Sequence, residues 1–226
     1  MTDRPIPQLP RPEAMTTQEY AYLRLRDAIM VGVLRPGTAL TFRGLAQQMD
    51  LSPTPIREAI RRLSSENAIE VLGNRRLRIP DMSAGRLEDL VELRVMLERH
   101  AILRAMPYLS EIAIDDLRRL DDNMDHAIAA RDLDALTRLN HRFHRDLYCL
   151  PPHHGAMALI ESVWLQLGPF QRRVVEQIET IIEVDHHKAI LKALADRDPV
   201  ALCAALESDI RDGILHLGRQ ILGQDD

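Results

Sequence analysis

The chain has 226 residues, which is enough for one large domain or two small ones with a buried core. Hydrophobic residues make up 46% and charged residues 28%, ordinary values for a globular chain, and the formal net charge is -5. The two cysteines, Cys149 and Cys203, exclude a disulfide scaffold and favour a reducing compartment such as the cytoplasm, and no apolar run of about 18 residues offers a membrane span.

The charge is distributed unevenly along the sequence. Residues 1–80 contain twelve arginines, no lysine and eight acidic residues, a net charge of +4. Residues 81–226 contain 17 basic and 26 acidic residues, a net charge of -9, and all nine histidines. This asymmetry indicates a basic module that meets a polyanion, joined to an acidic module with another task.

The N-terminal module begins with three predicted elements. Four prolines in the first twelve residues predict a disordered leader over residues 1–15 rather than a targeting sequence. A helix is expected from Thr17 to Gly32, where glycine is a common stop, and Pro36-Gly37 marks a tight turn. A short helix with a threonine N-cap follows over residues 41–49.

The next helix has the pattern of a recognition helix. Ser52 suits the N-cap, and Pro53 fits the first helical position, where no amide partner is needed. Arg57 and Arg61 lie one turn apart on a face outside the buried stripe, which consists of Ile56, Ala59, Ile60 and Leu63. Two short helices joined by a brief turn are typical of a helix-turn-helix.

A small hairpin is predicted after this helix, with its turn at Gly73-Asn74. It would form a wing that carries Arg75, Arg76 and Arg78 beside the helix. Because arginine pairs with phosphates and forms bidentate bonds to guanine edges, residues 16–80 are predicted to be a winged helix-turn-helix that binds double-stranded DNA. The alternative is a solvated arginine face on a winged-helix domain that binds protein.

The run from Tyr22 to Ile79 contains the motifs G-x-L-x-P-G-x-x-L, L-A and L-S-x-T-P-I-R-E-A-I-x-R-L, followed by the hairpin. With these motifs it resembles the DNA-binding domain of the GntR family of bacterial transcription regulators. The resemblance implies a wing in the minor groove and DNA contacts from Arg43, Ser52, Thr54 and Arg57. Two departures leave the operator sequence unpredicted: Pro53 replaces a frequent base-contacting arginine, and Arg76 replaces a frequent wing glycine.

From Ser83 onward the sequence predicts helices, which would form an antiparallel bundle over residues 84–222. The expected spans are 84–106, 110–130, 132–149, 154–179, 181–196 and 198–222. The predicted fold is therefore mainly α, an N-terminal winged helix-turn-helix followed by an all-helical antiparallel bundle.

Polar residues interrupt the apolar stripes of several bundle helices. They are Arg94 and Glu98 in the first, Asn140 and His144 in the third, His187 in the fifth and Asp209 in the last. Imidazole and carboxylate groups aimed into one bundle interior suit a divalent metal, because burying them without partners is costly. The alternative is a core of hydrogen-bonded histidines with an intrahelical Arg94–Glu98 ion pair.

Most of residues 86–215 is similar to the ligand-sensing FCD domain of the FadR-like GntR subfamily. The matching runs are D-L-V-E-L-R-V-M-L-E, N-H-R-F-H-R-D-L, H-H-K-A-I-L-K-A-L and D-P-V-A-L-C-A-A-L. Many FCD domains bind a divalent metal through one Asp and three His, and the metal helps to hold a small carboxylate effector. Carried over residue by residue, these ligands fall on Asn140, His144, His187 and Asp209, and His186 is left off the site.

Two of the four ligand positions therefore depart from the family pattern, since Asn140 replaces the Asp and Asp209 replaces the third His. The set is still expected to hold Zn, Ni or Mn with waters. The alternative is metal-free sensing, in which the same residues bind the ligand directly. Arg94 matches an FCD arginine and is expected, with Asn140, to bind an effector carboxylate, because its planar fork suits a bidentate pair.

The sequence thus predicts a cytoplasmic, homodimeric transcription regulator, more a repressor than an activator, on palindromic operator DNA. A small carboxylate effector would control its operator affinity. Two alternatives stay open: a helical metalloenzyme, and a DNA-binding protein without an effector. No catalytic residue is predicted, because the chain has no nucleophile elbow, Gly-rich phosphate loop or HExxH motif.

Overall fold

The computed structural model describes residues 4–73, 76–177 and 186–223. The chain divides into two compact units. The first contains the chain up to Met82 together with Trp164–Arg173, and the second contains Ser83–Val163 and the chain from Val174 onward. Helix α7, Met157–Val175, therefore contributes to both units.

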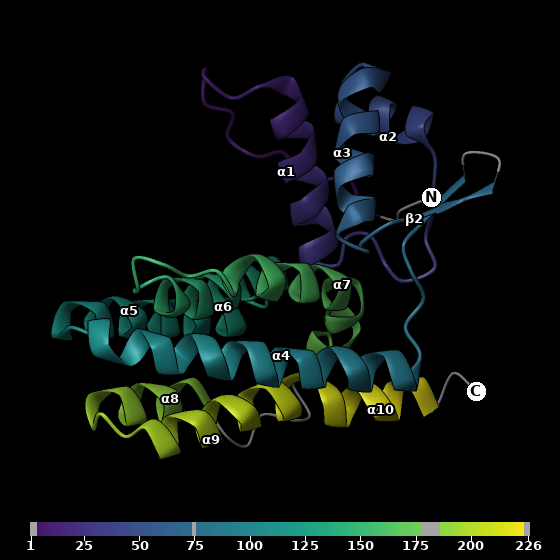
Figure 1. The fold of residues 1–226 in the computed structure, drawn as a ribbon. Helices are drawn as coiled ribbons and strands as arrows, with labels where there is room; N and C mark the ends of the chain where they lie inside the picture. Colours follow the sequence, from purple (N-terminus) through teal and green to yellow (C-terminus); the bar gives the residue numbers. More distant parts are fainter. Residues whose placement is uncertain (1–3, 74–75, 178–185, 224–226) are drawn as a thin grey trace. The chain divides into compact units, whose positions relative to one another are not determined.

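The first unit contains the winged helix-turn-helix predicted from the sequence. Its helices are α1 (Thr17–Met30), α2 (Phe42–Met49) and α3 (Pro53–Ser65), and its strands are β1 (Ala39–Leu40), β2 (Glu70–Leu72) and β3 (Arg76–Arg78). Helix α1 packs against α3 (Figure 1). The strands form an antiparallel sheet of order β1-β3-β2, in which Leu40 and Val71 both pair with Leu77. Strand β1, only two residues long, was not predicted.

Local sequence signals explain these boundaries. Thr16 and Thr41 accept hydrogen bonds from the backbone N–H groups of Glu19 and Gly44, which caps α1 and α2. Gly32 and Gly37 have φ values of +69° and +74°, a region that favours glycine, at the two turns between α1 and β1. The apolar stripe of α3 is buried as predicted, with Ile56, Ile60 and Leu63 at most 2% exposed.

The N-terminal segment packs on the first unit through a buried arginine. Arg24 of α1 donates hydrogen bonds to the backbone oxygens of Ile6, Pro7 and Met49, at 3.3, 2.9 and 3.0 Å. Ile6 itself is buried. The proline content predicts a disordered leader here, whereas residues 4–15 of the structure follow a defined path with these contacts.

The second unit is helical throughout its described residues. Its helices, besides the ends of α7, are α4 (Ala84–Ala105), α5 (Glu111–Ala129), α6 (Leu133–Tyr148), α8 (His186–Ala195), α9 (Pro199–Ile210) and α10 (His216–Gly223), with a 3-10 turn at Met106–Tyr108. The prediction of one last helix over 198–222 missed a π-helical segment, Arg211–Leu215, between α9 and α10. Residues 178–185, which the prediction assigned to two helices, lie outside the described residues.

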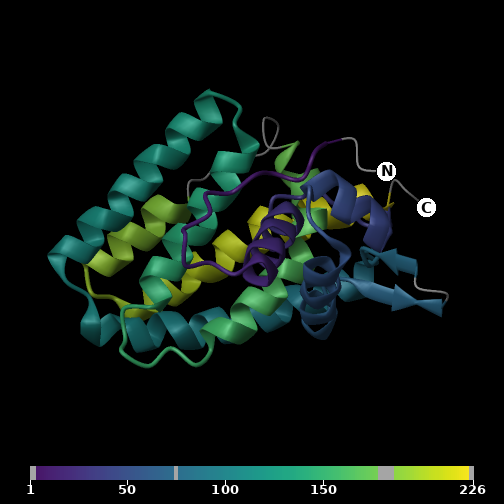
Figure 2. The ribbon, with the colours of Figure 1, turned by 90° about the horizontal axis from the view of Figure 1, so that it is seen from above.

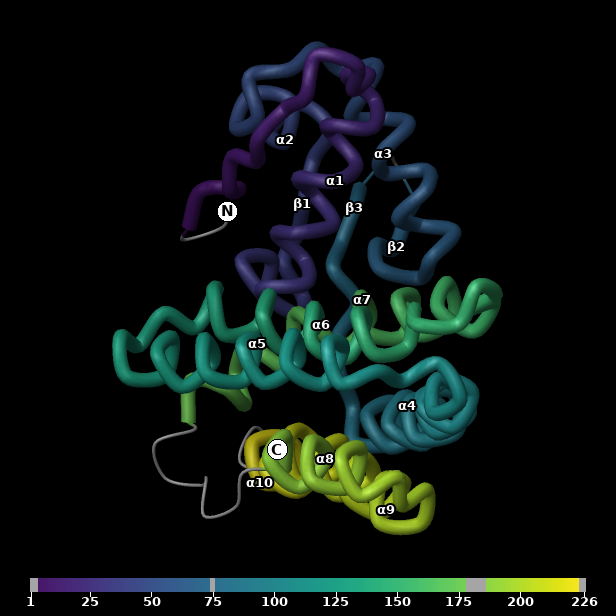
Figure 3. Tube along the Cα trace, turned by 90° about the vertical axis from the view of Figure 1, so that its left-hand side faces the viewer, coloured from purple at the N-terminus to yellow at the C-terminus, as the bar shows by residue number. Residues whose placement is uncertain are grey.

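Helix α4 is the central element of this unit. Figures 1 and 3 show α5 and α6 on one side of α4, and α8, α9 and α10 on the other. Helices α8 and α9 lie side by side, and α5 also contacts α8. Helices α4, α5, α6, α8 and α9 thus surround one interior, which is where the buried polar residues lie.

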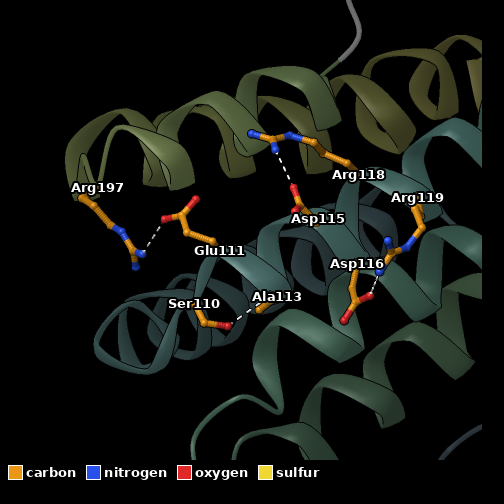
Figure 4. Close-up of polar contacts among 8 residues, drawn as sticks. All are labelled: Ser110, Glu111, Ala113, Asp115, Asp116, Arg118, Arg119 and Arg197. Atoms are coloured by element: carbon orange, nitrogen blue, oxygen red, sulfur yellow. Dashed lines mark hydrogen bonds and ion pairs between the residues drawn. The ribbon is translucent and has the colours of Figure 1, made fainter.

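Polar contacts fix the start of α5 and join it to the turn before α9 (Figure 4). Ser110 accepts a hydrogen bond from the N–H of Ala113 and caps α5. Arg197, in the turn before α9, donates to the backbone oxygen of Leu109 at 2.9 Å and contacts Glu111. The exposed pairs Asp115–Arg118 and Asp116–Arg119 belong to α5 alone, and exposed pairs of this kind contribute little to stability.

Replacing Gly168 with Ala should destabilise the first unit. A Cβ at this position of α7 would lie 2.9 Å from the backbone oxygens of Ile29 and Met30, atoms that cannot rotate aside. We expect a loss of about 1–3 kcal/mol from overpacking, which outweighs the better helix propensity of alanine. Urea unfolding measures it, with Gly85→Ala as the control, because Gly85 is an exposed helical glycine with open space around it. Equal stability of the two variants would contradict this close approach.

Candidate functional site

The first turn of α3 leaves a hydroxyl open to a partner. Ser52 occupies the N-cap position as predicted, but its side chain makes no capping hydrogen bond. Pro55, at the third helical position, has no N–H, which removes one of the two backbone donors that an N-cap side chain commonly uses. Ser52 and Thr54 are both exposed at the start of the helix.

The arginines predicted to contact DNA are exposed on α2 and α3. Arg43 lies on the first turn of α2, and Arg57 and Arg61 lie on α3. The guanidinium of Arg57 lies 5.5 Å from the ring centre of Phe42, a cation–π contact that connects the two helices. Arg61 pairs with Glu58 at 3.1 Å, and this exposed pair is weak enough for a phosphate to displace.

The wing arginines differ in their surroundings. Figure 2 shows the β2–β3 hairpin extending away from α3. Arg76 is exposed on β3, whereas Arg75 lies outside the described residues. Arg78 is held within the unit by Glu70 and Asp81, at 2.8 and 2.9 Å, and the hydrogen bond with Glu70 raises its pKa.

The second unit contains a chain of buried polar side chains that begins on α4. Arg94 donates to Glu98 at 2.7 Å, and both are at most 5% exposed. The hydroxyl of Tyr148, on α6, donates to the other oxygen of Glu98 at 2.8 Å. His144, one turn earlier on α6, places its Nδ1 3.1 Å from the same hydroxyl. The Arg94–Glu98 pair predicted from spacing is therefore part of a longer network.

This chain continues to a carboxylate on α9. The Nε2 atom of His144 lies 3.3 Å from one oxygen of Asp209, and the Nε2 atom of His187 lies 3.9 Å from the other. One ligand atom from each of these three residues lies within 4.8 Å of the other two. Two imidazoles and a carboxylate from α6, α8 and α9 thus converge on one point of the bundle interior.

The charges of this centre are set by its burial and by its partners. Burial raises the pKa of Asp209, but the hydrogen bond from His144 and the charges of His187, His144 and Arg94 outweigh burial, so its pKa lies below the usual range. For Arg94, burial lowers the pKa, and the charge and hydrogen bond of Glu98 more than restore it. Burial and the nearby Glu98 raise the pKa of Tyr148 well above its usual value. Asp209 is therefore ionised, Arg94 is cationic and Tyr148 keeps its proton.

The π-helical segment begins two residues after Asp209, and ion pairs join it to α4. Arg211 donates to both oxygens of Glu92, at 2.7 and 3.1 Å, and to Glu207 at 2.8 Å. The hydrogen bond from Arg211 lowers the pKa of Glu92. Single π-helical turns within helices are frequent at functional sites. Here the turn and its ion pairs fix the end of α9 that carries Asp209.

The remaining predicted residues lie around this centre. Asn140 is half-buried one turn before His144 on α6, so both side chains are on one face of the helix. His186, which the family pattern left off the site, pairs with Asp212 at 3.0 Å.

Sequence reasoning missed two members of the centre. One is Tyr148, and the other is the buried Asp121 of α5, whose carboxylate lies 4.0 Å from Nδ1 of His187. The rule that found Asp209 could have found both, because each is a polar residue in an apolar stripe: Tyr148 lies one turn after His144, and Asp121 lies one turn after Leu117.

Comparison with known families agrees with both halves of this description. The FCD domain family matches residues 89–212, and the family described as bacterial regulatory proteins of the gntR family matches residues 17–79. None of the described helices is long and apolar enough to cross a membrane.

The chain is similar to several curated transcription regulators. The HTH-type transcriptional regulator McbR of Escherichia coli K12 is 27% identical over 177 residues, which cover 77% of this chain and 80% of McbR. The gluconate operon transcriptional repressor of Bacillus subtilis 168 is 24% identical, over 94% of this chain and 91% of the repressor. The Nta operon transcriptional regulator of Aminobacter aminovorans is 29% identical, over 72% of this chain and 76% of its own.

Two solved structures share the fold. The structure of E. coli McbR/YncC has a TM-score of 0.82 and 25% identity, and the match covers 93% of this chain and 99% of that one. A GntR regulator from Rhodococcus sp. RHA1 has a TM-score of 0.70 and 23% identity, and the match covers 92% of this chain and 97% of that one.

A winged helix-turn-helix joined to a helical domain of this kind defines a bacterial transcription regulator that binds DNA and a small-molecule effector. The chain belongs to the FCD family of GntR-type regulators, as its sequence motifs predicted. Because the families and relatives are regulators, the chain is not an enzyme, and the metalloenzyme alternative is set aside.

Replacing Arg94 with Leu should strongly destabilise the second unit. The substitution leaves the Glu98 carboxylate buried without its cation, which costs about 3–5 kcal/mol. The double variant Arg94→Leu/Glu98→Leu should recover most of this loss, because it removes both charges. Urea unfolding of the two variants checks this, with Arg118→Leu as an exposed control that should change little. A double variant no more stable than Arg94→Leu alone would contradict the pairing.

Proposed function

We propose that the chain is a homodimeric, cytoplasmic repressor whose affinity for a palindromic operator changes when a small carboxylate binds its buried centre. In this proposal residues 16–80 form the DNA-binding domain and residues 84–222 form the effector-binding and dimerisation domain. The observation that carries this proposal is that the two units place different kinds of polar side chains in different environments. Exposed arginines lie on the helix-turn-helix, and ionised and imidazole groups are buried in the bundle.

The DNA-binding role is assigned to seven polar residues of the first unit, of which Arg75 lies outside the described residues. They are Arg43, Ser52, Thr54, Arg57, Arg61, Arg75 and Arg76. On α3, Arg57 supplies base contacts in the major groove, and the Ser52 hydroxyl and the open first turn suit a phosphate. Because a two-fold dimer presents the same surface twice, its operator is palindromic. Repression rather than activation is supported by the similarity to the gluconate operon transcriptional repressor.

The buried centre fits a divalent metal by the chemistry of its donors. Two imidazole nitrogens and one carboxylate oxygen, from His144, His187 and Asp209, are a set that binds Zn, Ni or Mn. Asn140 is the proposed fourth ligand, through its amide oxygen. When bound, the ion would offer open coordination positions to the oxygens of a carboxylate effector. The three residues come from three helices, so they also hold the effector site in the bundle core.

Arg94 is the proposed partner of the effector carboxylate. The Nε of Arg94 donates to Glu98. The charge of Asp209 contributes to the raised pKa of Arg94, so the guanidinium interacts electrostatically with the centre. A planar guanidinium has N–H groups on more than one edge, so it can donate hydrogen bonds to a second carboxylate beside the first. For regulation, the effector must bind one arrangement of the DNA-binding domains more tightly than the other.

Replacing Arg57 with Ala should weaken binding to a specific operator by about 1–3 kcal/mol if Arg57 reads a base. The operator is first selected from a random duplex pool, and fluorescence anisotropy then compares it with a scrambled duplex at the same salt concentration. Arg119→Ala, which removes an exposed charge from the second unit, should change neither affinity. An equal loss on both duplexes would show that Arg57 contacts phosphate only.

Replacing His144 with Ala should abolish the effector response and leave operator binding intact, because His144 lies in the second unit. Operator affinity is measured with a panel of short mono-, di- and tricarboxylates, before and after removal of divalent metal with a chelator. His126→Ala, an exposed histidine of α5, is the matched control. A response that survives in His144→Ala would remove this centre from the function. A response that chelation does not affect would favour direct binding of the ligand by the side chains.

A further inference from the structure

Both histidines of the buried centre turn the same ring nitrogen inward. The Nε2 atoms of His144 and His187 face opposite oxygens of Asp209, at 3.3 and 3.9 Å. Their Nδ1 atoms therefore face other groups. Which nitrogen of each ring carries the proton decides whether Nε2 can bind a metal, because only the nitrogen without a proton has a lone pair to donate.

Hydrogen-bond logic fixes the proton of His144. The hydroxyl of Tyr148 has one proton, and it is donated to Glu98 at 2.8 Å. The hydroxyl can then only accept from His144, whose Nδ1 lies 3.1 Å away, so Nδ1 is the donor.

A buried carboxylate acts in the same way on His187. Asp121 of α5 is 4% exposed, and one of its oxygens lies 4.0 Å from Nδ1 of His187. This separation is an ion-pair distance rather than a direct hydrogen bond. In a buried setting a carboxylate at such a distance still favours the ring form with the proton on the near nitrogen, Nδ1.

We propose that Asp121 and the Tyr148–Glu98 pair are positioning groups that hold the protons of His187 and His144 on Nδ1. Both Nε2 atoms thereby face Asp209. Each Nε2 can share a proton with this carboxylate or, without that proton, offer its lone pair to a divalent cation placed between the rings and Asp209. Carboxylates behind metal-binding histidines raise ligand basicity and fix ring orientation. This inference rests on the proposed function in that Nε2 is taken as the metal-binding atom.

The first test is the Zn²⁺ affinity of the full chain, measured by competition with a chromophoric chelator. Asp121→Asn removes the charge behind His187, and Tyr148→Phe removes the hydroxyl behind His144. Each should weaken Zn²⁺ binding by about 10- to 100-fold. The controls are Asp122→Asn and Tyr108→Phe, exposed residues of the same types, which should bind as the wild type does. Wild-type affinity in both Asp121→Asn and Tyr148→Phe would overturn the inference.

The second test needs no metal and separates this inference from the proposed metal site. Nitrogen-15 NMR of the metal-free chain reports which ring nitrogen carries the proton. We expect Nδ1–H for both histidines in the wild type, a loss of that preference for His144 in Tyr148→Phe, and the same loss for His187 in Asp121→Asn. If the wild type shows these forms but binds no Zn²⁺, the metal proposal fails and the positioning role stands. Rings that carry their proton on Nε2 and none on Nδ1 in the wild type would overturn the inference whatever the metal result.

Discussion

A carboxylate buried among helices needs positive charge or hydrogen-bond donors around it, and Asp209 imposes that requirement on the second unit. Its neighbours His144 and His187 come from α6 and α8, and Arg94 on α4 adds its charge from within the bundle. Glu98 then connects Arg94 to Tyr148 and, through it, to His144. The packing of the bundle and the chemistry of the centre therefore depend on the same contacts, and a ligand carboxylate that engages Arg94 acts on Glu98 as well.

The two units treat charge in opposite ways, and the difference follows from what each one binds. In the first unit Arg57, Arg61 and Arg76 stay at the surface, where a polyanion can replace weak partners such as Glu58. The buried exception, Arg24, donates three hydrogen bonds to backbone oxygens and serves the fold. In the second unit the charges at the centre lie in the bundle interior and are paired, which suits a small ligand that must be held apart from water.

The positions of the helices and the family were predictable from local sequence signals. Features that depend on tertiary geometry were not predictable in this way. Apolar periodicity and capping residues such as Thr41 and Ser52 located the helices, and the motif around Arg57 identified the family. The π-helical turn after Asp209 escaped because an apolar stripe continues through it. Pro55 takes away one backbone donor to Ser52, but only the structure shows that the capping bond is missing. Asp121 carried a readable signal, yet its neighbour His187 is far away in sequence.

The most direct measurement of the central claim is anomalous X-ray diffraction from crystals of the full chain grown with Zn²⁺. The account predicts one strong peak per chain at the buried centre, about 2.0–2.2 Å from Nε2 of His144, Nε2 of His187 and an oxygen of Asp209. A peak at exposed histidines alone, such as His153 and His154, would contradict it. So would a peak bound by Nδ1 of either histidine, because the hydrogen-bond network would then have the opposite direction.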